Sequence, residues 1–382
     1  MAESRRDLRI DYIRGMIMMI VITVHMEYYS LYSFLVWERV GVISSAEGFV
    51  AMSGMVLGMV YGAKLHRDGF AFCAGKMFDR SIQLYRVAIT VVLLVAALNL
   101  LPFIDAQAIM QWVNPGTKEV FPLYPSAEAP LKFWVKQILL LRSGPHQFQV
   151  MGLYFVLLLA APLILFALHK GRALLVIGLS WVLYALFWAA PMRPTGAQFE
   201  YAFPLLAWQL LFVHAMVLGF HKDTIFSLFS GTTGRVAFWI ALAISTGFWL
   251  YAMNNPNPVL PDWAKLDWID SGTFYQIHGE FFSKSKLGLG RIANNLALFM
   301  VVMGLLTRFW VPLQRAFGWL FIPIGQASLY VFIVHVFFVL AASLTPWHEA
   351  ENFWANTLMH TAAIAAIWFM VKNKVLYGLI PR

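Results

Sequence analysis

The sequence predicts an all-α protein, a polytopic transmembrane helical bundle of about ten helices. Of its 382 residues, 60% are hydrophobic and 12% are charged, and the mean hydropathy is +0.68. Soluble chains carry about 25% charged residues, so this deficit indicates that lipid surrounds most of the chain. The apolar residues also gather in runs close to the roughly 20 that a helix needs to cross the hydrocarbon core. The short alternating segments of a transmembrane barrel are not seen.

Ten apolar runs follow one another along the chain, and each is predicted to form a membrane-spanning helix. Their limits are 12–34, 44–64, 82–102, 148–168, 173–191, 203–220, 235–253, 292–310, 318–342 and 354–376. The two longest connections, 103–147 and 254–291, are short and interrupted by proline, so we expect a single integral-membrane domain over residues 1–382. The first run has no small-residue cleavage site and is interpreted as a retained helix.

The basic residues predict how the helices are oriented. With the amino terminus in the cytoplasm, basic residues gather on the cytoplasmic side and most acidic residues fall on the other, as the positive-inside rule expects. The basic set is Arg5, Arg6, Arg9, Lys64, Arg67, Lys76, Arg80, Lys170, Arg172, Lys222, Arg235, Arg308, Arg315, Lys372, Lys374 and Arg382, and the acidic set includes Glu119, Glu128, Asp262, Asp267, Asp270 and Glu280. We therefore expect a multi-pass protein of the bacterial inner membrane with both termini cytoplasmic.

The same topology accounts for the net charge of +9, which gives no reason to expect a nucleic-acid partner. The single cysteine, Cys73, falls in a predicted cytoplasmic loop and leaves no disulfide or cysteine metal site to expect. No metal site is predicted from any other residues.

Polar residues inside the first run carry the clearest functional signal. Arg14 and His25 are eleven residues apart in RIDYIRGMIMMIVITVHMEYY, close to three helical turns, so they share a face. Asp11, three residues before Arg14, joins the same stripe. Arg14 and His25 are separated by roughly 16–17 Å along the axis, which suits an elongated anionic substrate entering the bundle. The alternative is that Arg14 is a flanking anchor and His25 a packing residue.

The second run combines a packing signal with a carboxylate. Gly54, Gly58 and Gly62 recur every four residues and form a ridge that another helix can approach closely. The ridge would serve a contact between two copies equally well, so a homo-oligomer stays open. Glu47, at the outer mouth of this run, lies near the predicted depth of His25. Its carboxylate would orient the imidazole, unless it is simply solvated at the membrane surface.

Further candidates lie in the third and ninth runs. Arg80 and Arg86 open the third run, and Arg86, further inside, should need a carboxylate or phosphate partner. His335 lies seven residues after Ser328 and therefore on the same face; its alternative is a satisfied core histidine. In the loop 254–291, aromatic residues stand beside carboxylates, a mixture that suits sugar rings or, equally, an interfacial aromatic belt.

Taken together, these segments resemble the OpgC family, the membrane succinyltransferases of osmoregulated periplasmic glucans, which are related to the acyltransferase-3 superfamily. The run RDLRIDYIRG, a later histidine, AEGFVAMSGMVLGMVYG and RSIQLYR match the family's opening. Arg14 and His25 match the superfamily's Arg-x10-His signature, and Phe49, Ser53 and Gly54 match its Phe-x3-Ser-Gly motif. Further matches are LYFVLLLAAPLI, LLAWQLLF, KSKLGLGRIANNLAL and GQASLYVFIVH, so the resemblance covers nearly the whole chain. Gln326 and Ala327 depart from the OpgC pattern, which often has a basic residue or a histidine there.

The resemblance implies an acyltransferase that moves succinyl from cytoplasmic succinyl-CoA to hydroxyls of a periplasmic glucan, with no permanently bound cofactor. His25 would be the general base, oriented by Glu47, while Arg14, Arg80 and Arg86 would bind the acyl-CoA. Asp11, Ser53 and His335 would support the site, and an arginine of the third helix or Arg291 would meet the succinyl carboxylate. A direct transfer and an acyl-histidine route both stay open. Two alternatives remain: an O-acetyltransferase that uses acetyl-CoA on another exported polysaccharide, and a solute or proton transporter.

Overall fold

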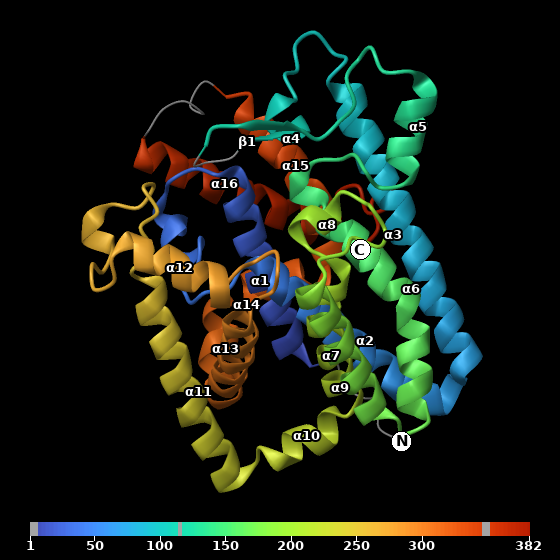
Figure 1. The fold of residues 1–382 in the computed structure, drawn as a ribbon, viewed down its shortest axis with the longest axis vertical. Helices are drawn as coiled ribbons and strands as arrows, with labels where there is room; N and C mark the ends of the chain where they lie inside the picture. The colour runs from blue at the N-terminus through green and yellow to red at the C-terminus, as the bar shows by residue number, and fades with distance from the viewer. Residues whose placement is uncertain (1–6, 114–116, 346–351) are drawn as a thin grey trace. The chain divides into compact units, whose positions relative to one another are not determined.

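The computed structural model describes residues 7–113, 117–345 and 352–382, and these are helical apart from loops and one small hairpin (Figure 1). Arg5 and Arg6 of the predicted cytoplasmic set lie outside the described residues. The elements are α1 (Leu8–Met26), η1 (Leu31–Leu35), α2 (Ser45–Asp68), α3 (Phe70–Leu98), α4 (Gln107–Met110), β1 (Gln111–Val113), β2 (Val120–Pro122), α5 (Leu131–Leu139), η2 (His146–Phe148), α6 (Val150–His169), α7 (Ala173–Ala189), α8 (Phe199–Ala202), α9 (Leu205–Phe220), α10 (Lys222–Leu228), α11 (Gly231–Ala252), η3 (Asp262–Ala264), α12 (Ser271–Phe281), α13 (Leu289–Arg308), α14 (Trp310–Gln326), α15 (Ser328–Ser343) and α16 (Phe353–Lys372). The predicted all-α class is confirmed; β1 and β2 pair antiparallel within the loop 103–147.

Six helical segments of the described chain are long and apolar enough to cross a membrane: α2, α3, η2 with α6, α11, α13 and α16. The number rises to eight if two bent pairs each form one span, α9 with α10 at 86° and α14 with α15 at 90°. The remaining predicted runs correspond to α1 and α7, which do not meet the same test because α1 carries charges and α7 has 17 residues. The cytoplasmic placement of the termini stays a prediction.

Two of the predicted runs are interrupted for reasons that can be found in their residues. The run 12–34 stops being an α-helix at Met26, because Glu27 adopts a left-handed conformation with φ of 58° and Ser30 then caps the 3-10 helix η1. The run 318–342 breaks at Ala327, between α14 and α15. Pro323 lies in the last turn of α14 and has no N–H for the helix ladder, which favours a bend at this place.

The chain packs as two compact units. The first comprises Met1–Phe49, Phe226–Ser283 and Gly288–Arg382, and the second comprises Val50–Ile225 and Lys284–Leu287. In the first unit, α1 packs against α14, α15 and α16, and α11 packs against α13. In the second, α3 packs against α6, and α7 against α9. The expectation of one integral-membrane domain stays a prediction.

Glycines allow the closest helix contacts in both units. In the first unit, a methyl group on Gly15 of α1 would overlap the backbone carbonyl of Phe321 in α14. In the second unit, the predicted ridge on α2 packs against α9: a methyl group on Gly54 would meet the Phe212 carbonyl, and one on Gly58 the Met216 carbonyl. The ridge therefore serves packing inside this unit, as helices with small residues at their interface do.

Candidate active site

The polar stripe of α1 faces the residues around the break between α14 and α15. Arg14 donates a hydrogen bond from Nη2 to the Ser328 hydroxyl at the start of α15, and its Nη1 lies 3.8 Å from Asp11 Oδ1. The Asp11 side chain is buried, and its Oδ2 accepts from Gln326 Nε2 at 3.4 Å. Gln326 therefore supplies an amide partner for the buried Asp11 carboxylate. Arg14 and Asp11 thus lie in one polar cluster, as the helical spacing predicted.

Three turns further along α1, His25 meets the second intramembrane histidine. His25 Nδ1 lies 2.9 Å from His335 Nε2, and the two rings stack with centroids 5.0 Å apart. On its other side, His335 Nδ1 lies 2.7 Å from the Phe332 carbonyl oxygen. His335 is 1% exposed and so belongs to the packed interior of the first unit.

The direction of these hydrogen bonds fixes the tautomers of the neutral pair. A carbonyl oxygen only accepts, so His335 Nδ1 carries a proton and donates it to Phe332. His335 Nε2 is then an acceptor, and His25 Nδ1 donates to it. The lone pair of the neutral His25 ring consequently lies on Nε2, the nitrogen that His335 does not engage. A general base needs such a lone pair, held in a fixed direction.

Phe49, the first residue of the Phe-x3-Ser-Gly match, packs beside the hydrogen-bonded histidine pair. Its ring stacks on Phe332 with centroids 5.3 Å apart, and Phe332 in turn lies 5.0 Å from the His335 ring. The motif therefore contributes a packing contact that holds the residue whose carbonyl orients His335.

The predicted pairing of Glu47 with His25 is wrong. Glu47 is fully buried, and its Oε1 accepts from Arg291 Nε at 2.5 Å. Its Oε2 accepts from the Ser44 N–H at 2.9 Å and from the Ser44 hydroxyl. A carboxylate in a buried position is stabilised most by a full opposite charge, and Arg291 at the start of α13 supplies it. The residue that orients His25 is His335.

Arg291 extends this cluster to the loop that follows α1. Its Nη1 donates to Glu38 and, at 3.1 Å, to the Phe282 carbonyl, while Glu38 Oε2 lies 3.0 Å from His278 Nε2 in α12. Burial opposes ionisation of Glu38, but the hydrogen bond to His278 and the charge of Arg291 outweigh it and hold the pKa of the Glu38 carboxyl below its usual range. Arg291 is thus bound to two carboxylates, which does not favour its predicted contact with a succinyl carboxylate.

The three remaining candidates, Arg80, Arg86 and Ser53, belong to the second unit, and their roles stay predictions. Arg80 donates from Nη1 to Gln83 Oε1 at 2.6 Å on the same helix. Arg86 is exposed in the middle of α3, the longest apolar helix of the described chain. A charge exposed on an apolar span usually marks a ligand path or a partner.

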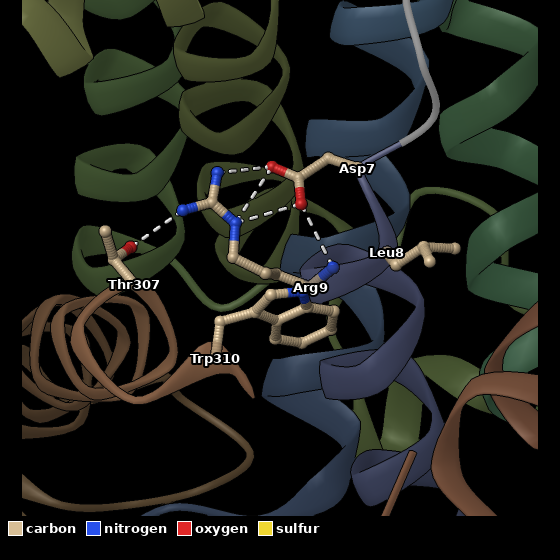
Figure 2. Close-up of a pocket in the computed structure, with 5 residues that line it drawn as sticks. All are labelled: Asp7, Leu8, Arg9, Thr307 and Trp310. Atoms are coloured by element: carbon tan, nitrogen blue, oxygen red, sulfur yellow. Dashed lines mark hydrogen bonds and ion pairs between the residues drawn. The ribbon is translucent and has the colours of Figure 1, made fainter. Parts of the chain in front are cut away.

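A pocket opens at the amino-terminal end of α1, the end nearer to Arg14. It encloses about 340 Å³ and is lined by Asp7, Leu8, Arg9, Thr307 and Trp310. Figure 2 shows the Arg9 guanidinium between the Asp7 carboxylate and the Thr307 hydroxyl, with the Trp310 indole beside it. Arg9 Nη2 lies 2.6 Å from Asp7 Oδ2, and Nη1 donates to Thr307 Oγ1 at 2.8 Å. The sequence offered no signal for this pocket, because α1 and α14 meet only in the folded chain.

The sequence did contain a signal for the histidine pair. Ser328 and His335 share a face of α15 by their seven-residue spacing, as Arg14 and His25 share a face of α1, and the two faces meet. Glu38 and His278 were missed because nothing in the sequence places the loop after α1 against α12.

Within the described ranges, no group of three or more His, Cys, Asp or Glu side chains could hold a metal ion.

The fold and this site define an all-α protein whose described residues include six to eight candidate membrane spans and a pair of hydrogen-bonded histidines inside one helical unit. The chain belongs to the OpgC family: the family model described as OpgC protein matches residues 6–377. The family is of acyltransferase type, and membership implies a role in glucan succinylation. No curated protein and no solved structure matches the chain.

Proposed function

We propose that the protein is a transmembrane O-acyltransferase that moves succinyl from cytoplasmic succinyl-CoA to hydroxyls of a periplasmic glucan. The observation that supports this most is the hydrogen-bonded chain from His25 through His335 to the Phe332 carbonyl, on the helix whose other end carries Arg14. Family membership supports the substrates, and the tautomer of His25 supports the reaction type.

In the proposed reaction, His25 Nε2 accepts the proton of a sugar hydroxyl, and the sugar oxygen attacks the thioester carbonyl of succinyl-CoA. The new carbon–oxygen bond forms the ester, the carbon–sulfur bond breaks, and the CoA thiolate leaves. The proton on His25 then passes to that thiolate. Throughout, His25 Nδ1 keeps its hydrogen bond to His335, so the ring does not need to reorient as it gains and loses charge.

The donor would lie along α1 with its nucleotide end near Arg14. Arg9 and His25 are sixteen residues apart, about 24 Å along a helix, a length that an extended pantetheine arm and its phosphates can follow. The pocket next to Arg9 suits the nucleotide, since Trp310 offers a ring face for a purine and the Arg9 guanidinium offers N–H donors for phosphate. The family resemblance makes Arg80 and Arg86 further candidates for binding acyl-CoA, and that role stays a prediction.

The test uses purified protein in nanodiscs with succinyl-CoA and glucan that lacks succinyl groups. Thiol release and succinyl esters on the glucan are both measured, the second by mass spectrometry. We expect both products from the wild type and a loss of at least about 100-fold in kcat for His25→Ala. Arg14→Ala should instead raise the KM for succinyl-CoA more than it lowers kcat.

Three results would contradict the proposal. Full transfer by His25→Ala would exclude this histidine as the base. Transfer from acetyl-CoA and none from succinyl-CoA would make the protein an O-acetyltransferase. Solute or proton flux in liposomes without any thioester consumption would make it a transporter.

A further inference from the structure

Five aromatic rings contact one another in succession near the end of α1 that carries His25. This series, called here the aromatic track, consists of Trp263, Phe34, Tyr29, Phe353 and Trp354. Along it, successive ring centroids are 5.5, 6.3, 5.2 and 5.1 Å apart, and the planes of successive rings are inclined by 31°, 64°, 53° and 83°. The outermost rings, Trp263 and Trp354, are 78% and 71% exposed, and the three between them are half-buried.

One residue of the track, Tyr29, follows the candidate base closely in the sequence. Tyr29 is only four residues beyond His25, and α1 ends between them at Met26. The rings come from three separate segments: the connection after α1, the loop that contains η3, and the first turn of α16. Three distant parts of the sequence therefore bring their aromatic residues together at one end of α1.

Hydrogen bonds hold these segments in place. The Asn356 amide of α16 donates to the Tyr29 carbonyl at 3.0 Å, and the Leu31 N–H donates to the Thr357 hydroxyl at 3.0 Å. Arg39 donates to the Ala264 carbonyl, next to Trp263 in the sequence. The track is thus pre-organised, and a ligand that stacks on it loses little binding free energy to ordering the protein.

The polar groups beside the track favour a sugar over lipid. Asp262, adjacent to Trp263, is 95% exposed at its carboxylate and pairs with Lys265 at 2.8 Å. Acyl chains disfavour such a charge, whereas sugar hydroxyls hydrogen-bond to it. Rings of an interfacial belt anchor helices at both membrane surfaces, whereas these rings contact one another at one end of α1.

We propose that the aromatic track binds the acceptor as a chain of pyranose rings, with sugar C–H faces on the exposed faces of Trp263, Trp354 and the half-buried rings between them, and one hydroxyl presented to His25. This inference rests on the proposed function and extends it by assigning the acceptor subsite. It also implies that affinity rises with the number of sugar residues, since each added sugar meets another ring.

The test separates glycan binding from transfer. Binding of unsubstituted periplasmic glucan, of its shorter oligosaccharides and of glucose is measured by calorimetry with no acyl donor, and the KM for each substrate is measured separately. Trp263→Ala and Phe34→Ala should weaken glucan binding roughly three- to tenfold and raise its KM by a similar factor, with the KM for succinyl-CoA unchanged. Trp263→Phe should restore most of the affinity, because the ring face returns.

The matched control is Trp239→Ala on α11, which removes a tryptophan 65% exposed in the same unit but outside the track. Unchanged glucan binding in both track variants would overturn the inference, as would an equal loss in Trp239→Ala or an affinity for glucose equal to that for oligosaccharides. Glucan binding is measured without an acyl donor. If the track variants weaken glucan binding, the acceptor subsite is supported even when no succinyl is transferred. If the track variants transfer succinyl with an unchanged KM for glucan, the inference about the track is wrong but the proposed function still holds.

Discussion

At the scale of single residues, the important partner of His25 is another histidine. A carboxylate beside a histidine stabilises its charged form, whereas a neutral imidazole mainly fixes direction and tautomer. His335 does this through a hydrogen bond of 2.9 Å to His25 and one of 2.7 Å to the Phe332 carbonyl. The pair therefore suits a base that must be neutral when the sugar hydroxyl arrives.

His335→Ala should lower kcat about 10- to 100-fold and leave both KM values nearly unchanged, because the variant removes the acceptor of the His25 Nδ1 hydrogen bond and leaves the residues proposed to bind each substrate in place. His335→Gln should recover part of the loss, since its amide oxygen accepts the same hydrogen bond from His25 Nδ1. Steady-state kinetics with both substrates varied provides the measurement. Equal losses in the two variants, or losses confined to KM, would show that His335 acts only in packing.

At the scale of the elements, the position of α1 depends on close contact with α14. Gly15 lies against the Phe321 backbone, and Gly325 lies equally close to the Asp11 backbone, so the two helices approach each other without side chains between them. The same contact brings Asp11 to Gln326 and Arg14 to Ser328. Packing between these two helices thus decides where the polar stripe lies.

Gly15→Ala should therefore destabilise the protein by about 1–3 kcal/mol, because the added methyl group overlaps a backbone carbonyl that cannot move without displacing α14. Gly247→Ala in α11 is the control, since a methyl group there meets nothing within 4 Å and alanine favours the helix. Thermal unfolding in detergent, followed by tryptophan fluorescence, should show a lower Tm only for the first variant. An unchanged Tm for Gly15→Ala would mean that α1 and α14 are less closely packed.

Helical periodicity predicts which side chains share a face of one helix, and this was enough to group Asp11, Arg14 and His25. It also placed Ser328 and His335 together on α15. Periodicity does not indicate which helix lies opposite, and His25 and His335 are 310 residues apart in the sequence. The assignment of Glu47 failed for this reason: depth alone placed it near His25, but the neighbour that supplies its charge partner comes from α13.

At the scale of the whole molecule, a buried ion cluster connects segments from three parts of the chain. Glu38 comes from the loop after α1, Glu47 from α2, and Arg291 from α13, while His278 of α12 is the fourth residue and pairs with Glu38. Removing one partner from such a cluster costs more than the pair contributes, since the remaining charge stays buried. The cluster therefore fixes the loop that carries Tyr29 and Phe34 of the aromatic track.

The lowered pKa of Glu38 makes this contribution dependent on pH. Because the folded-state pKa lies below the unfolded value, the stabilisation is complete above roughly pH 4.3, the ordinary value for glutamate, and is lost as the pH falls through the folded-state pKa. Glu38→Gln should lower the free energy of unfolding at pH 7 by about 1.5–3 kcal/mol. The difference in stability between this variant and the wild type should become smaller below about pH 4.

Tm values from pH 7 down to pH 3 provide the measurement, with Glu280→Gln, an exposed glutamate of α12, as the matched control. The control should follow the wild-type curve throughout. A deficit for Glu38→Gln that stays constant across this range would show that Glu38 is not held ionised by His278 and Arg291. A Tm difference that disappears at low pH would show that the charge of Glu38, and not only its size, stabilises the loop that follows α1.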